Sequence, residues 1–211
     1  MARGDSQGLA KFFHRWARVV TLLTAPAAAL LAFFASDVIR AWSGDAGLAA
    51  DTGPLLAVLA VGTFIHGQCV LPYQVQLAAG WTSLAIWTNV AAIAATAVAL
   101  PIFVPLHGAL AAAWCWVGVA SLYFAATTVI FFRLHLIGER SRFLLNDVAL
   151  PVTAAFGTMA LCRAAFPAAP DNFAGQMLML GAAGALSFAA TTGAVFAVDR
   201  LRAPREAAPA P

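Results

Sequence analysis

Charge is the scarcest property of this 211-residue sequence. Asp, Glu, Lys and Arg together make up 10% of it, whereas soluble domains carry about 25%. None of the four occurs from Thr52 to Phe132, and hydrophobic residues make up 62% of the chain. Water could not solvate such a stretch in a soluble fold. The composition therefore excludes soluble enzymes, nucleic-acid readers and disordered proteins, and it predicts a polytopic membrane protein.

Cysteine is also scarce, and the usual signatures of catalysis are missing. Cys69, Cys115 and Cys162 lie far apart in apolar segments without metal-ligand spacing, so we expect them to be packing residues. The sequence has no GxSxG, no HExxH and no glycine-rich phosphate loop after a strand. The acidic residues that acid–base chemistry would need lie almost entirely in expected loops. We therefore expect no enzyme activity, no cofactor, no metal site and no nucleic-acid partner.

Six apolar segments are long enough to cross a bilayer, for which a helix needs about 20 mainly apolar residues. Helices are expected because lipid cannot satisfy free backbone groups and because no segment shows the alternation of a barrel strand. The fifth segment is the weakest, since Asn146, Asp147 and Pro151 lie in its first turns. The predicted fold is an all-α membrane bundle with six transmembrane helices, at residues 19–35, 54–78, 83–104, 108–132, 144–162 and 173–198.

The distribution of Lys and Arg predicts that both termini are cytoplasmic, because these residues concentrate in cytoplasmic loops. With six spans, residues 1–18, 133–143 and 199–211 lie on one side of the membrane, and they contain every basic residue except Arg40 and Arg163. We expect the leader, residues 1–18, to form a basic amphipathic helix suited to anionic lipid headgroups, or else an ordinary positive flank of the first span. The Ala- and Pro-rich tail, residues 199–211, is predicted to be disordered.

Polar residues within the membrane gather in the second span. Five positions fall on one stripe of a continuous helix there: Gly62, His66, Cys69, Tyr73 and Gln76. Such groups face either a wet cavity that handles a hydroxyl-rich substrate or protons, or a neighbouring helix with which they only form hydrogen bonds. Four aromatic residues are either sugar-stacking residues or interfacial anchors: Trp81, Trp114, Trp116 and Tyr123. Trp81 lies in a turn and is expected to be an anchor. The candidates for lining a substrate cavity are His66, Gln68, Tyr73, Gln74, Gln76 and, in the third span, Asn89.

Two prolines and one run of small residues have predicted mechanical roles. Pro26 and Pro72 are hinge candidates, and Pro72 cannot donate a hydrogen bond to the carbonyl of Gln68. Asp37 and Arg40 are expected to pair locally at the outer end of the first span. Small residues at four-residue spacing permit close contact between helices, which predicts a packing stripe in the sixth span at Gly181, Ala185, Ala189 and Gly193.

The run from Leu71 to Gly80, LPYQVQLAAG, resembles a recurrent segment of polysaccharide biosynthesis proteins. These are lipid-linked oligosaccharide flippases, of the O-antigen type, in the multidrug/oligosaccharidyl-lipid/polysaccharide exporter superfamily. The segments Ile39–Gly44 and His107–Ala113 and the residue Asn89 are also similar to that family. The similarity extends from residue 2 to about residue 135, and the last two spans fit only as generic hydrophobic helices.

The resemblance implies a transporter that flips or exports lipid-linked oligosaccharide by alternating access across a bacterial inner membrane, during synthesis of polysaccharides such as lipopolysaccharide. Its implied partners are membrane lipid, a polyprenyl-linked oligosaccharide and a second lobe or subunit, because family members have two lobes and this chain resembles the C-terminal one. The main alternative is a non-catalytic accessory or structural membrane subunit of envelope polysaccharide synthesis. A membrane-embedded transferase and a cation-coupled antiporter fit less well, since spans two to four contain no acidic residue.

Overall fold

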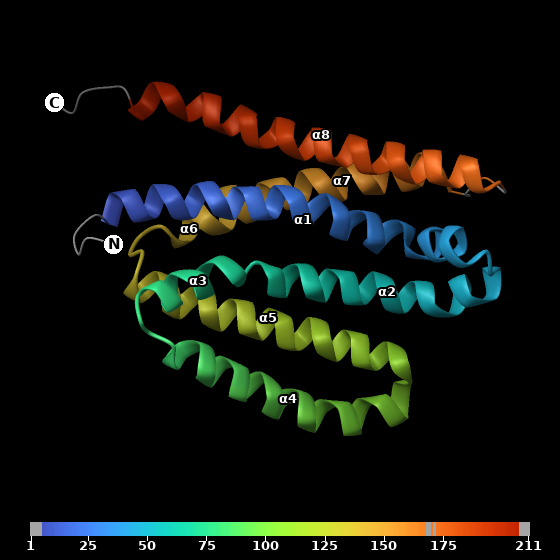
Figure 1. Ribbon diagram of the computed structural model, residues 1–211, viewed down its shortest axis with the longest axis horizontal. Coiled ribbons are helices and arrows are strands. Elements are labelled where there is room, and N and C mark those ends of the chain that lie inside the picture. The colour runs from blue at the N-terminus through green and yellow to red at the C-terminus, as the bar shows by residue number, and fades with distance from the viewer. Residues whose placement is uncertain (1–5, 168–169, 171, 207–211) are drawn as a thin grey trace.

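The computed structural model describes residues 6–167, 170 and 172–206 of the chain, and this part is built from helices without any strand (Figure 1). Six of its helical segments are long and apolar enough to cross a membrane, which confirms the predicted all-α bundle of six spans. The elements are α1 (Ser6–Ser43), α2 (Ala46–Gly67), α3 (Val70–Ala78), α4 (Ser83–His107), α5 (Ala109–Leu134), α6 (Arg140–Arg142), the π-helix η1 (Phe143–Ala149), α7 (Leu150–Ala165) and α8 (Phe173–Glu206).

The helices form an elongated row rather than a closed ring (Figure 1). α1 packs against α2 on one side and against α7 and α8 on the other, while α5 lies between α2 and α4. α4 forms one edge of the row, and only Leu84 and Ala85 of that helix are buried. Most of α4 is therefore covered by lipid or by another molecule rather than by this chain.

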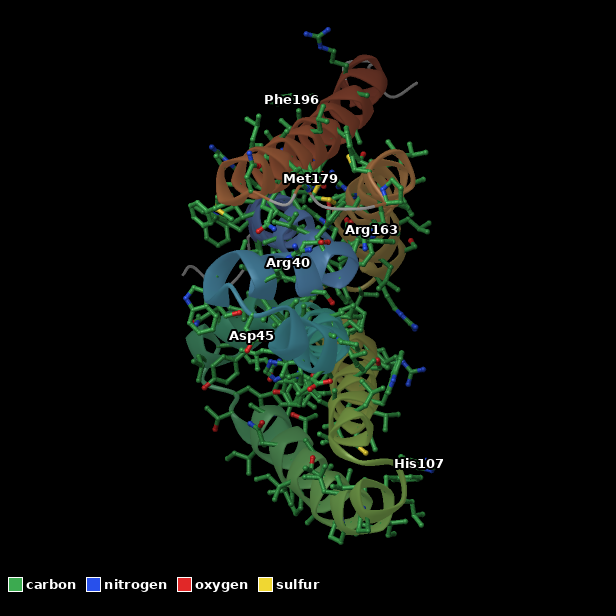
Figure 2. The ribbon with its side chains drawn as sticks, turned by 90° about the vertical axis from the view of Figure 1, so that its right-hand side faces the viewer. Arg40, Asp45, His107, Arg163, Met179 and Phe196 are labelled. Carbon is green, nitrogen blue, oxygen red and sulfur yellow. The ribbon has the colours of Figure 1, made fainter. Side chains whose placement is uncertain are left out.

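The start of α1 and the end of α8 lie at the same end of the bundle along the helix axes, as an even number of spans requires (Figure 1). The opposite end, which Figure 2 views, displays Arg40, Asp45, His107 and Arg163. Tight connections shape this opposite end: Gly44 and Gly108 have φ angles of 72° and 71°, which side-chain-bearing residues rarely adopt. The cytoplasmic location of the end with the termini stays a prediction.

The predicted leader is not a separate segment, because α1 runs from Ser6 through residue 18 into the first span. Phe13, which is fully buried, lies 5.3 to 5.6 Å from the ring centres of Phe131, Phe132 and Phe143. This aromatic packing holds the start of α1 inside the bundle. The leader thus presents only one face outward, where Lys11, Phe12, Arg15 and Trp16 are exposed.

At its other terminus the chain is also more helical than expected, since α8 continues to Glu206. The helix thus enters the tail that the composition predicts to be disordered, and it does so across Pro204. The remainder of that tail, residues 207–211, lies outside the described residues.

The bend in α1 lies at Phe34, whose φ and ψ of −125° and 21° are not helical, whereas the hinge candidate Pro26 lies within the helix before it. The guanidinium of Arg163 on α7 lies 5.2 Å from the centre of the Phe34 ring and donates to Asp37 Oδ2 at 2.7 Å. Asp37 is thus joined to α7 by an ion pair that spacing within α1 alone did not predict. The bend and the ion pair together fix α1 against α7 at the end opposite the termini.

The small-residue stripe of α8 is exposed rather than packed: Gly181, Ala185, Ala189 and Gly193 all face away from the other helices. The buried face of α8 lies beside that stripe and contains Gln176, Leu180, Ala183, Ser187 and Thr191. Ser187 Oγ on this face donates to the carbonyl oxygen of Ala155 on α7 at 3.2 Å. The prediction for the packing face was therefore wrong within this chain, because a larger apolar side chain and hydroxyl groups supply the contact.

Candidate functional site

The predicted second span is interrupted where the polar residues gather. α2 ends at Gly67 and α3 begins at Val70, and the amides of Gln68 and Cys69 bond back only three residues, to the carbonyls of Ile65 and His66. Such tightened turns mark breaks in helices. Pro72 follows the break and offers no N–H to the carbonyl of Gln68. The hinge candidate Pro72 thus lies next to an actual discontinuity.

A groove of about 560 Å³ lies between α2, α4 and α5. Its apolar lining includes Ile93 and Leu100 of α4 and Val119 of α5. Ile93 is 68% exposed, so the groove is open along α4 rather than enclosed. The polar and aromatic side chains that line it are His66 of α2, Asn89 and Thr96 of α4, and Trp116 and Tyr123 of α5.

Aromatic rings form the wall between α2 and α5. The ring centre of His66 lies 5.4 Å from that of Trp116 and 5.1 Å from that of Tyr123. Trp116 Nε1 also donates to Thr63 Oγ1 at 3.4 Å. Gly62 makes this approach possible, because a Cβ at that position would lie 2.5 Å from Trp116 Cδ1. The His66 ring is tilted by 40° to Trp116 and by 47° to Tyr123, so the wall consists of inclined aromatic rings with polar edges.

The amide of Asn89 is the one strongly polar group of α4 in the groove. Asn89 is exposed, and its side chain forms no hydrogen bond within the part of the chain that the structure describes. Asn89 lies six residues after the start of α4, a rise of about 9 Å along the helix. In hydrocarbon an unpaired amide costs several kcal/mol. A membrane-embedded Asn89 therefore requires a polar partner, which the described part of this chain does not provide.

Gln68 does not line the groove but joins α2 to α1. Its side chain is buried and accepts a hydrogen bond from Thr21 Oγ1 at 2.9 Å. Its Nε2 lies 3.5 Å from both Thr24 Oγ1 and the carbonyl oxygen of Phe64. Gln68 therefore forms hydrogen bonds between helices rather than lining a cavity.

The remaining candidates lie on α3, beyond the helix break. Gln76 is 2% exposed, and its Oε1 has no hydrogen-bond partner among the described residues. Tyr73 and Gln74 are exposed outside the groove. The interruption at Gln68 and Cys69 ends the continuous stripe on which the prediction depended. Of the six candidates, the structure therefore brings only His66 and Asn89 together.

Thr96 was not among the sequence candidates, although the sequence contained a signal for it. It follows Asn89 by seven residues, which is two helical turns and places both on one face of α4. Its Oγ1 already donates to the carbonyl oxygen of Ala92 at 2.8 Å. Thr96 therefore adds polarity to the groove mainly as an acceptor.

Comparisons with protein-family models, with curated proteins and with solved structures gave no significant match to this chain. The fold places the chain in the class of multi-pass α-helical membrane proteins. The candidate site is the groove between α2, α4 and α5, which carries a few polar and aromatic side chains in a mainly apolar lining. The family resemblance of the segment from Leu71 to Gly80 stays a prediction.

Proposed function

We propose that this chain is a membrane transporter, or one lobe of a transporter, that moves a lipid-linked oligosaccharide across the bacterial inner membrane. The observation that carries this proposal is the unpaired amide of Asn89 in a groove shared with His66 and Tyr123. The sequence resemblance to oligosaccharide flippases supports the same substrate class.

The barrier to such transport is the transfer of sugar hydroxyls through hydrocarbon, where each unsatisfied polar group costs several kcal/mol. Asn89 and His66 provide donors and acceptors for hydroxyls, and Trp116 and Tyr123 provide flat apolar faces for the rings of a sugar. Because the groove is open along α4, a lipid tail remains in the bilayer while the sugar is bound. No covalent step is needed.

The mechanical part of the proposal rests on the discontinuity between α2 and α3. Transporter sites are commonly built beside interrupted helices, and access alternates as one bundle rocks against another. Here the break at Gln68 and Cys69 lies directly after His66, which lines the groove. A small change in the angle between α2 and α3 would therefore move one wall of the groove. The second bundle would be another lobe or a second subunit.

The alternative is an accessory subunit without a substrate of its own, and one observation favours it. α4 has only two buried residues, so a partner protein could cover both α4 and the groove. In that case the amide of Asn89 would bind a polar group of the partner rather than a sugar. A substrate-binding measurement distinguishes the two functions.

The test uses the full chain reconstituted in liposomes with a polyprenyl-linked oligosaccharide that carries a fluorescent label on its sugar. Binding is measured by titration, and movement by protection of the label from a membrane-impermeant quencher. Asn89→Leu should weaken binding roughly two- to tenfold, the effect of one lost hydrogen bond. Gln74→Leu is the matched control, because it replaces an exposed amide outside the groove.

Equal effects of the two substitutions would contradict the assignment of the groove. If the unsubstituted chain neither binds nor moves the labelled lipid, the accessory function replaces the transporter. Binding without movement supports the lobe version of the proposal, in which a second bundle is required for access to alternate.

A further inference from the structure

A buried ionic cluster, which shares no residue with the groove, fastens the start of α1 to the fifth span. Asp147 in η1 is fully buried, and it contacts two basic side chains of α1. His14 Nδ1 is hydrogen-bonded to Asp147 Oδ2, and Arg18 Nε donates to Asp147 Oδ1 at 2.9 Å. His14 Nε2 lies 3.1 Å from Oε2 of Glu139, in the connection between α5 and α6. This cluster joins segments more than 120 residues apart in the sequence.

The two hydrogen bonds of His14 determine how many protons the cluster holds. A neutral imidazole donates through one ring nitrogen and accepts through the other, whereas an ionised carboxylate only accepts. Both nitrogens of His14 face carboxylate oxygens. Both hydrogen bonds therefore require either a doubly protonated imidazole or one protonated carboxyl group. In each case the cluster holds one proton more than a neutral histidine with two carboxylates.

Each carboxylate of the cluster also faces a guanidinium group. Arg18 faces Asp147 from α1, and Arg142 Nη1 of α6 lies 3.8 Å from Glu139 Oε2. The proton is held between His14 and the two carboxylates. In the described part of the chain no group of His, Cys, Asp and Glu side chains is arranged to hold a metal ion. The ligand that fits this cluster is a proton.

Loss of the proton would break the contact at Glu139 rather than the one at Asp147. Asp147 has no exposed surface and keeps its bond to Arg18, whereas the side chain of Glu139 is 32% exposed and can turn toward water. We propose that His14, Asp147 and Glu139 form a proton-binding site whose occupancy fastens the connection between α5 and α7 to α1. This inference concerns the proton alone and does not rest on the proposed substrate.

The π-helical geometry of η1 supports a specialised role for Asp147. π-helices are rare and occur frequently at functional sites. In this chain the π-helix spans Phe143–Ala149 and contains the buried carboxylate.

Hydrogen–deuterium exchange of the full chain in lipid nanodiscs tests the proposal. The amide of Phe143 donates to the carbonyl oxygen of Glu139 at 3.0 Å, so its exchange reports whether this connection is fastened. Exchange is compared at about pH 6 and about pH 9, on either side of the range in which histidine ordinarily titrates, after correction for the intrinsic rate. We expect exchange roughly tenfold or more faster at the higher pH, because a charge-assisted hydrogen bond is lost.

Three variants and one internal reference make the result specific. His14→Gln and Glu139→Gln should each abolish the pH response, because neither can place a proton between two carboxylates. Glu139→Gln changes a half-exposed residue, so it remains informative if the buried substitution His14→Gln impairs folding. His135→Gln should keep the response, since His135 lies in the same connection outside the cluster. The amide of Gly108, which donates to Val104 at 2.8 Å at the other end of the bundle, should show no response.

Three results would overturn the proposal. The first is an unsubstituted chain whose Phe143 exchange is independent of pH after correction. The second is a pH response that persists in both His14→Gln and Glu139→Gln. The third is a response that disappears in His135→Gln, which would assign the titration to His135 instead.

Discussion

Replacing Gly53 with alanine should separate α1 from α2 near the bend in α1. A Cβ at Gly53 would lie 2.0 Å from Ser36 Oγ and 2.9 Å from both Cα and Cβ of Ser36. Contacts this short cannot persist, and because one of the atoms belongs to the backbone, rotation of a side chain cannot relieve them. α1 or α2 must move.

The expected cost follows from two opposing effects. Overpacking of a well-filled interface costs about 1–3 kcal/mol, and we take about 3 because the overlap includes backbone. Replacing glycine by alanine within a helix returns about 1 kcal/mol. The net loss of about 2 kcal/mol corresponds to a fall in Tm of about 4–8 °C for a chain of this size. Thermal unfolding in detergent, followed by tryptophan fluorescence, measures it.

Gly118→Ala is the matched control, because a Cβ at Gly118 in α5 meets nothing within 4 Å. That substitution should raise Tm by about 2–4 °C through helix propensity alone. Adding Ser36→Gly to Gly53→Ala removes the contacts with Oγ and Cβ and should restore part of the loss. If Gly53→Ala is as stable as Gly118→Ala, the close approach of α1 and α2 at this point is incorrect.

Two further predictions concern the hydrogen bond of Thr21 and the titration of His135. Thr21→Val removes the donor to Gln68 and should destabilise the bundle by about 0.6–1.7 kcal/mol. Thr24→Val should cost less, because the contact between Thr24 and Gln68 is 3.5 Å. Unfolding in a denaturing detergent compares the two variants, and equal effects would argue against the hydrogen bond of Thr21. Burial lowers the pKa of His135 from its ordinary value of 6.5, so its contribution to stability is complete above that pH and is lost as the pH falls below it. Tm measured from about pH 8 to about pH 5 should therefore fall less steeply for His135→Gln, and an unchanged slope would exclude His135 as the titrating group.

The six spans could be predicted because hydropathy averages over many residues. One substitution hardly changes such an average, and a run without charge such as residues 109–132 has no other stable location than a bilayer. The ends of helices depend on fewer residues and were less predictable. The helix of the first span extends to Ser43, beyond the predicted end of the span at residue 35, and the ion pair of Asp37 with Arg163 lies within this extension.

The choice of partners could not be read from the sequence, because helical periodicity gives the faces of one helix and not the neighbour of each face. Gln68 and His66 are two residues apart, yet one bonds to Thr21 and the other faces the groove. Asp147 was notable only as a weakness in the fifth span, and nothing local indicated His14 as its partner. Periodicity also did not identify the face of α8 that packs against the other helices, because the small-residue stripe and the buried face lie side by side.

The row arrangement of the helices has a consequence for biosynthesis. α2, which contacts α1, follows it directly in the chain, but α7, which follows the segment containing Asp147, is made only after α3, α4 and α5. His14 and Arg18 must therefore stay accessible while the intervening helices insert. A closed ring would hide them, whereas in the observed row α2, α5 and α4 extend away from the side of α1 that receives α7 (Figure 1). The open shape thus leaves His14 and Arg18 accessible to the carboxylate of Asp147, which is synthesised later.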